Sequence, residues 1–313
     1  MLENIDLTKT LDKESYKKRM SDLSDRLYRV HQLSWERGIP VAIVFEGWDA
    51  SGKGSTIHKL IDPIDPRGYK IYPLRAMRTY EKRRPWLWRF WLKIPARGEW
   101  AIFDRSWYGR VLVERVEKLV SKNECERAYR DIIDFERNLA DDGTLILKFF
   151  LHISKKEQAK RFKKLRKDPL NTWRVTKEDW RNHEHYKDWL KVYEEMLEKT
   201  DSEFAPWTIL EATDKRHTRI KVYETIINAL EERLGVNAES QPNGAQAAPV
   251  EQAAPVDRAA DGSMSERNNG QVDKHSDQDN PAETPDDAPA QAPANDPTQE
   301  AALPKDANPN EEV

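Results

Sequence analysis

Two short motifs hold the residues of this chain whose types and spacing could do chemistry. The first is FEGWDASGKGS at residues 45–55, in which Gly47, Gly52 and Lys53 fit the pattern G-x-x-x-x-G-K. The glycines allow backbone torsions that turn successive N–H groups toward one anion, and a helix that follows would add its positive end. Lys53 would then reach the terminal phosphates of a donor. The motif predicts a phosphate-binding loop, and the alternative is a tight strand-to-helix turn without a ligand.

This loop departs from the common pattern at one position. Gly54 follows Lys53 where Ser or Thr usually supplies a hydroxyl for Mg²⁺, so that hydroxyl is either missing or supplied by Ser55. Asp49 inside the loop is then expected to hold Mg²⁺, because hard cations prefer oxygen ligands such as carboxylates.

The second motif is FDRSWYGR at residues 103–110. Asp104 ends an apolar segment, and ligands of parallel sheets bind at the carboxyl ends of the strands. We therefore expect Asp104 to face the same crevice as Lys53 and to bind Mg²⁺ directly or through water. Arg105 and Arg110 suit multi-point contact with phosphate. The alternative is that Asp104 only caps the next helix.

A third feature is a basic segment between Lys155 and Lys167, with eight Lys or Arg residues against one acid. A charge run is usually a solvated helix face. This one follows a strongly apolar segment, where small nucleotide kinases carry a lid that excludes water from the transferring group. We expect a lid over about 154–185, with Arg161 and Arg166 neutralising charge between donor and acceptor.

The pattern of apolar residues predicts the elements that position these motifs. Strands are expected at residues 41–47, 70–75, 100–104, 144–153 and 205–212. Helices are expected at about 7–37, 53–61, 81–94, 108–120, 124–140, 154–167, 177–199 and 215–234. Strands that alternate with helices imply an α/β fold, in which helices cover both faces of a parallel sheet.

Composition divides the chain near residue 235. All 11 tryptophans lie before that point, whereas residues 236–313 contain no Phe, Trp or Tyr and 10 of the 18 prolines. This tail carries 4 Lys and Arg against 16 Asp and Glu, a net charge of −12, so residues 1–235 carry the other 48 against 39, a net charge of +9. We expect a disordered acidic tail, either a solubilising appendage or a competitor for a basic cleft. Residues 1–235 are expected to form one domain that binds a polyanion.

Other classes of protein are disfavoured by composition. A single cysteine, Cys125, provides neither a disulfide framework nor a cysteine-based metal site. No apolar run reaches the roughly 18 residues that a membrane-spanning helix needs. The polar residues 1–14 do not resemble a signal peptide, so we expect a cytoplasmic protein without a membrane partner.

Several long segments strongly resemble polyphosphate kinase family 2, and most of all its polyphosphate:AMP phosphotransferase branch. They cover nearly all of residues 7–234 but not the tail. The segments are FEGWDASGKGSTI, IDPRGY at 64–69, LWRFWLKIPARGEWAIFDRSWYGRVLVERVE at 87–117, KFFLHISKKEQAKRF at 148–162 and APWTILEATDKR at 205–216.

The resemblance implies a three-layer P-loop kinase fold related to thymidylate kinases, with a helical lid. It also implies an inorganic polyphosphate donor, a nucleotide acceptor and a requirement for Mg²⁺, with AMP converted to ADP as the expected reaction. The catalytic residues that it implies are Asp49, Lys53, Asp104 and Arg105, with Arg161 and Arg166 as the available lid arginines. Some members of the AMP branch carry two fused kinase domains, so this single domain is expected to act alone or as a homo-oligomer.

The basic domain agrees with a polyphosphate donor, which has no base or ribose and needs a long basic track. Binding of such a polyanion should weaken steeply with salt. Phosphate-binding candidates are Gly47, Gly52, Lys53, Gly54 and Ser55 in the loop, and Lys59, Arg67, Arg75, Arg78, Arg83, Arg84 and Arg110 beyond it. Trp48, Trp107 and Tyr108 would either stack on the acceptor base or pack in the core.

The same sequence features leave three alternative interpretations open. The first is a polyphosphate-dependent kinase that makes ATP from ADP or GTP from GDP, and the second is an ATP-dependent nucleoside monophosphate kinase. The third is a non-enzymatic regulator that binds polyphosphate, or that stacks single-stranded bases on the Trp and Arg residues of segment 84–91. The complete set of four catalytic candidates argues against a degenerate site, and we expect no specific nucleic-acid partner.

Overall fold

The computed structural model describes residues 1–236, which belong to one compact unit. The predicted disorder of the tail and its competition for a cleft concern residues 237–313, outside the described residues. None of the helices between residues 1 and 236 is long and apolar enough to cross a lipid bilayer.

A single sheet of five parallel strands forms the centre of the fold, in the order β2-β3-β1-β4-β5. Its central strand, β1, is buried at every residue, which is why its sequence VAIVFEG is almost continuously apolar. The strands are β1 (Val41–Gly47), β2 (Tyr69–Pro73), β3 (Trp100–Asp104), β4 (Leu145–His152) and β5 (Trp207–Glu211). The predicted α/β architecture with a parallel sheet is confirmed.

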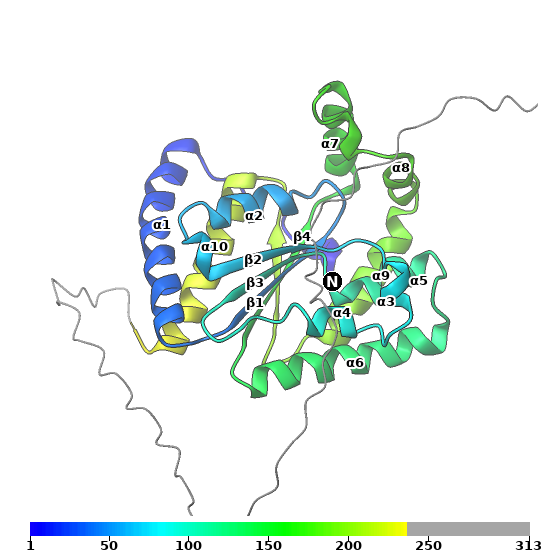
Figure 1. Ribbon diagram of the computed structural model, residues 1–313. Coiled ribbons are helices and arrows are strands. Elements are labelled where there is room, and N and C mark those ends of the chain that lie inside the picture. Colours follow the sequence, from blue (N-terminus) through cyan, green and yellow to red (C-terminus); the bar gives the residue numbers. More distant parts are fainter. Residues whose placement is uncertain (237–313) are drawn as a thin grey trace, which may run out of the picture. The chain divides into compact units, whose positions relative to one another are not determined.

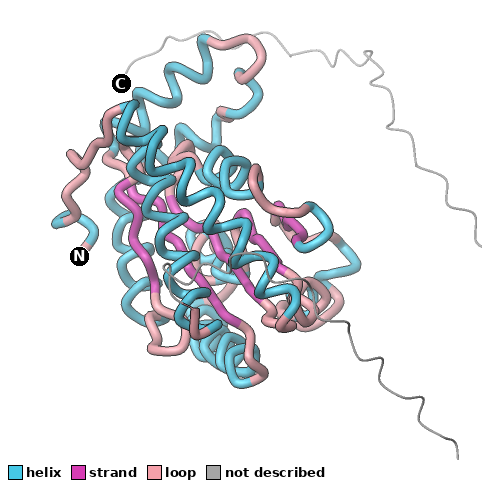
Figure 2. The backbone as a smooth tube through the Cα atoms, turned by 90° about the vertical axis from the view of Figure 1, so that its left-hand side faces the viewer, coloured by secondary structure: helices cyan, strands magenta, loops and turns pink. Residues whose placement is uncertain are grey.

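Helices cover the sheet on both sides. Helices α1, α2 and α10 lie on one side and α6 and α9 on the other, while α7 extends away from the sheet (Figure 1). Seen from the side of α1 and α10, the helices pass in front of the strands (Figure 2). The helices are α1 (Lys13–Glu36), α2 (Lys53–Ile61), α3 (Thr79–Lys82), α4 (Trp88–Trp91), α5 (Val113–Val116), α6 (Lys122–Asp141), α7 (Lys155–Lys167), α8 (Lys177–Glu184), α9 (Tyr186–Thr200) and α10 (Lys215–Leu234).

Four predicted helices differ from the observed ones. The first helix begins at Lys13 rather than near residue 7, because the Asp12 side chain accepts hydrogen bonds from two N–H groups of the first turn. Segment 81–94 forms the short helices α3 and α4, because Pro85 cannot continue a helix. Segment 108–120 forms a 3₁₀ turn (Trp107–Arg110) followed by α5, and segment 177–199 is divided at His185 into α8 and α9.

The strand register brings the two motifs together at one edge of the sheet. Phe45 of β1 pairs with Asp104 of β3, and Gly47 pairs with Leu151 of β4. The loop after β1 therefore starts beside the end of β3, as expected for ligand sites at the carboxyl ends of parallel strands.

Candidate active site

The phosphate loop joins β1 to α2 and is built on left-handed backbone torsions. The φ angles of Gly47, Ala50 and Gly52 are 130°, 56° and 108°. A Cβ atom at Gly47 would collide with the carbonyl oxygen of Leu151, so no side chain fits there against the backbone of β4. Glycine at this position therefore lets the loop turn directly against the sheet.

Lys53 is buried at the mouth of this loop. Its Nζ atom donates to the carbonyl oxygens of Gly47 at 2.7 Å and Trp48 at 3.1 Å, which leaves one of its three donors for a ligand. Burial lowers the pKa of Lys53, as does the Arg105 cation, while the carboxylates of Asp49 and Asp104 oppose this shift.

The second motif meets the loop through its acid and its first arginine. Arg105 has a left-handed φ of 65°, and its Nη2 atom donates to Oδ1 of Asp49 at 3.0 Å. Asp104 ends β3, and its Oδ2 atom lies 3.8 Å from the point where a side chain at Gly54 would begin. The structure thus brings Asp49, Lys53, Asp104 and Arg105 together from two separate motifs.

Sequence reasoning missed a buried carboxylate in this cluster, Glu46. Its Oε1 atom accepts a hydrogen bond of 2.8 Å from Ser106 Oγ, which links β1 to the second motif. Burial raises the pKa of Glu46, although the Lys53 ammonium and the Ser106 bond oppose the rise. The sequence signal for it was an acidic residue inside an otherwise apolar strand. A buried carboxylate needs a hydrogen-bond or charge partner.

A cavity of about 260 Å³ opens beside this cluster. Glu46, Asp49 and Arg105 line it on the side of the phosphate loop. The other lining residues are Gly47, Gly109, Leu112, Val113, Thr176, Glu178, Asp179, Asn182, Trp189 and Tyr193. The cavity therefore has apolar walls from α5 and α9 and a polar rim from α8, which lies in the predicted lid.

Arg161 contacts the carbonyl oxygens of the phosphate loop. Its Nη1 atom donates to Ala50 O at 3.0 Å and Ser51 O at 2.7 Å, and its Nη2 atom donates to Ala212 O at 2.7 Å and Thr213 O at 3.0 Å. The guanidinium therefore fastens the phosphate loop and the β5–α10 loop to α7. Nε also donates to Glu157 at 2.9 Å, so all five N–H donors of Arg161 are used within the chain. These contacts make Arg161 a residue that shapes the loop, and the catalytic role predicted for it stays a prediction.

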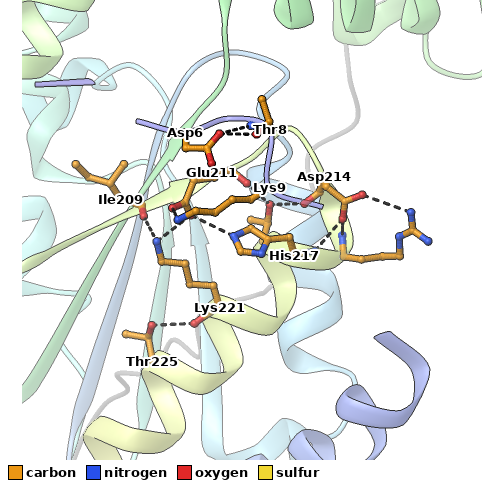
Figure 3. A network of polar contacts seen from close by, with 11 residues as sticks. Asp6, Thr8, Lys9, Ile209, Glu211, Asp214, His217, Lys221 and Thr225 are labelled. Atoms are coloured by element: carbon orange, nitrogen blue, oxygen red, sulfur yellow. Dashed lines mark hydrogen bonds and ion pairs between the residues drawn. The ribbon is translucent and has the colours of Figure 1, made fainter. Parts of the chain in front are cut away.

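The β5–α10 loop is itself held by a polar network around Glu211 (Figure 3). Glu211 accepts bonds of 2.8 Å from Lys9 and from Lys221, and His217 lies 3.3 Å away. Burial alone would raise the pKa of Glu211, but its bonds to Lys221 and Lys9 lower it to about 2. The segment before α1 is thereby fastened to the end of β5.

The other predicted phosphate-binding side chains lie apart from the cluster or have partners of their own. The Ser55 hydroxyl donates to Gly52 O at 3.0 Å. Three of the predicted cations form ion pairs: Lys59 with Asp62 at 2.9 Å, Arg67 with Asp65 at 2.8 Å, and Arg110 with Glu114 at 2.9 Å and Glu124 at 3.6 Å. The other predicted arginines are exposed, namely Arg75, Arg78, Arg83, Arg84 and Arg166.

The aromatic residues of both motifs belong to the core. Trp48, Trp107 and Tyr108 are at most 2% exposed. The Trp48 ring stacks on Tyr186 with 3.9 Å between ring centroids. Of the two interpretations of these residues, core packing agrees with the structure and stacking on the acceptor base does not.

A buried ion pair supports the turn that follows Arg105. Lys148 of β4 and Glu136 of α6 are fully buried and lie 2.8 Å apart. Lys148 also donates to Tyr108 Oη at 3.0 Å and Thr200 O at 2.8 Å, while Glu136 accepts from Trp107 Nε1 at 2.9 Å and Tyr108 Oη at 2.7 Å. Every donor of the lysine is used, and the second motif is anchored to two other elements.

The loop is also sensitive to the protonation of His152. Trp48 Nε1 donates to Nδ1 of His152 at 3.0 Å, which requires that nitrogen to be unprotonated. Burial lowers the pKa of His152 from 6.5 to about 4, although the Glu194 carboxylate opposes the shift. Since the folded pKa is lower than the unfolded one, the neutral imidazole stabilises the fold fully above about pH 6.5, and this contribution is lost as the pH falls toward 4.

We expect His152→Gln to flatten the pH dependence of stability. The wild type should lose up to about 3 kcal/mol of unfolding free energy from this group between pH 6.5 and 4, and the variant should lose correspondingly less. Urea unfolding across this range measures the difference. His58→Gln, at an exposed histidine, is the control, and equal pH slopes in the wild type and His152→Gln would contradict the assignment.

Known proteins resemble this chain in sequence and in architecture. The polyphosphate kinase 2 family model matches residues 10–237. A polyphosphate:AMP phosphotransferase of Pseudomonas aeruginosa is 43% identical over 231 residues, which are 74% of this chain and 47% of that protein. An AMP/ADP-polyphosphate phosphotransferase of Meiothermus ruber is 34% identical over 220 residues, covering 70% of this chain and 82% of the relative.

Solved structures agree with the sequence matches. The crystal structure of polyphosphate kinase 2 from Arthrobacter aurescens matches with a TM-score of 0.72 and 30% identity, over 78% of this chain and 89% of that one. The chain spans about half the length of the Pseudomonas relatives that it matches. The resemblance noted in the sequence is confirmed, and this chain belongs to the polyphosphate kinase 2 family.

Proposed function

We propose that this protein transfers the terminal phosphate of inorganic polyphosphate to a nucleotide, with AMP converted to ADP as its main reaction. The observation that carries the proposal is the convergence of Asp49, Lys53, Asp104 and Arg105 beside one cavity. Relatives named for polyphosphate and AMP support the choice of substrates. A cytoplasmic location and a homo-oligomeric state belong to the same proposal.

The donor would bind at the phosphate loop. The left-handed torsions of Gly47, Ala50 and Gly52 would turn backbone N–H groups toward a bound phosphate, and the amino end of α2 adds partial positive charge there. Lys53 keeps one donor for the terminal phosphates, and its burial strengthens that interaction because the surrounding dielectric is low.

Asp49 and Asp104 are the residues that would hold Mg²⁺. In phosphotransferases Mg²⁺ is usually bound by one or two carboxylates and completed by substrate phosphates and water. Two carboxylates beside Lys53 fit this pattern. When bound, Mg²⁺ would neutralise charge on the transferring group.

The acceptor would occupy the cavity, with its phosphate toward Arg105 and its base between the apolar walls. A nucleotide phosphate is mostly ionised at pH 7, since its second pKa is about 6, so the acceptor needs little help from a general base. Asp49 holds the Arg105 guanidinium at 3.0 Å, which keeps this cation at the cavity edge, where charge spreads during in-line transfer.

The proposal is tested with purified protein, long-chain polyphosphate and Mg²⁺, supplied with AMP, ADP or GDP in separate reactions. ADP formed from AMP, with little ATP formed from ADP, is the expected result by chromatography. Product only from ADP or GDP would keep the donor and change the acceptor. Activity only with ATP and a nucleoside monophosphate would refute the polyphosphate donor.

A further inference from the structure

A second concave surface lies away from the active-site cavity, between α1, α2 and α10. It is a groove of about 580 Å³, lined by Tyr16, Lys17, Met20, Ser21, Ser24, Asp25, Lys59 and Arg219. We call it the distal groove. Its lining carries three cations and two serine hydroxyls against one carboxylate, although Asp62 also pairs with Lys59. The proposed function gives this groove no role in binding the acceptor or in catalysis.

One residue of the distal groove contacts the first turn of α2, just beyond the phosphate loop. Arg219 lines the groove, and its Nη2 atom donates to the carbonyl oxygen of Ser55, two residues beyond Lys53. Lys59 lies one helical turn farther along α2, about 6 Å from Ser55. The groove therefore lies beside α2 and α10, close to the start of α2 at the proposed donor site.

Positive charge also collects where this path begins. Lys215 stands one turn before Arg219 on α10. Burial lowers the pKa of Lys215, and so do four neighbouring cations, Arg161, Arg219, Lys164 and Arg174. These cations repel one another, and binding of an extended anion would reduce that repulsion.

We propose that the distal groove binds the far phosphates of a long polyphosphate whose end is held at the phosphate loop. This inference rests on the proposed function for the identity of the donor. A linear chain of repeated charge fits both the loop and the groove, because the same ligand chemistry recurs along its length. A longer donor brings more phosphates into contact with the groove than a donor of three phosphates does, so the groove would make the enzyme prefer long chains.

The test compares Lys17→Gln with Lys18→Gln. Both lysines are exposed on α1, but only Lys17 lines the groove. We expect Lys17→Gln to lower kcat/KM for long-chain polyphosphate roughly three- to tenfold relative to tripolyphosphate, and to reduce the slope of log(kcat/KM) against log salt by about 0.7–0.9. Lys18→Gln should change neither quantity.

Equal behaviour of the two variants with long chains would overturn the inference, as would an equal loss with long and short donors. Calorimetric titration of all three proteins with long-chain polyphosphate separates this result from failure of the proposed function. If the wild type binds long chains, weaker binding by Lys17→Gln alone supports the groove even without turnover. If the wild type binds no polyphosphate, both ideas fail.

Discussion

Replacing Lys53 by methionine is expected to lower kcat for phosphate transfer by about 10³-fold. Methionine keeps the length and apolar stem of the side chain but removes the ammonium that we propose binds the transferring phosphates. Since the acceptor cavity is lined by other residues, the KM for the nucleotide should change little. Initial rates at saturating polyphosphate, with AMP varied, measure both quantities.

Lys70→Met provides the matched control, because Lys70 is 61% exposed and pairs with Glu99 on the surface of β2. Its kcat should stay close to that of the wild type. Thermal unfolding of Lys53→Met should show a folded protein, since removal of a buried cation also removes the cost of its desolvation. A Lys53→Met variant that keeps more than a tenth of the wild-type kcat would contradict the assigned role.

The parts of this structure that sequence predicts are those set by local pattern. The apolar run at residues 41–47, the glycines of the loop and Asp104 at the end of a strand each follow from a rule that concerns a few neighbouring residues. The parallel sheet then places the loop and Asp104 at the same edge, because parallel strands share their carboxyl ends. For this reason the main cluster could be predicted from the sequence.

The contact partner of each charged side chain could not be predicted from the sequence. Arg110 resembles a phosphate ligand in the motif FDRSWYGR, but it pairs with Glu114 and Glu124. Arg161 is one of eight similar cations in its segment, and only the packing of α7 brings it to the carbonyl oxygens of the phosphate loop. Pairings of this kind depend on tertiary contacts, so a count of basic residues overestimates those free for a polyanion.

Lys148→Met should destabilise the fold strongly, by about 3–5 kcal/mol of unfolding free energy. The loss arises because Glu136 would remain fully buried without a countercharge. Urea denaturation of the wild type and the variant measures it through the midpoint and slope. Lys70→Met, which removes an ion pair of similar length at an exposed lysine, should cost no more than about 1 kcal/mol.

A second substitution separates the charge effect from lost packing. Glu136→Gln keeps an oxygen that can accept from Trp107 and Tyr108 but removes the negative charge. The double variant Lys148→Met/Glu136→Gln should therefore be more stable than Lys148→Met alone, with a coupling energy of about 1–3 kcal/mol. If the two effects simply add, the pair is not what stabilises this region. Trp107 and Tyr108 directly follow Arg105 and Ser106, so a change in their support should also affect kcat. If the double variant regains unfolding free energy relative to Lys148→Met, its kcat should rise as well.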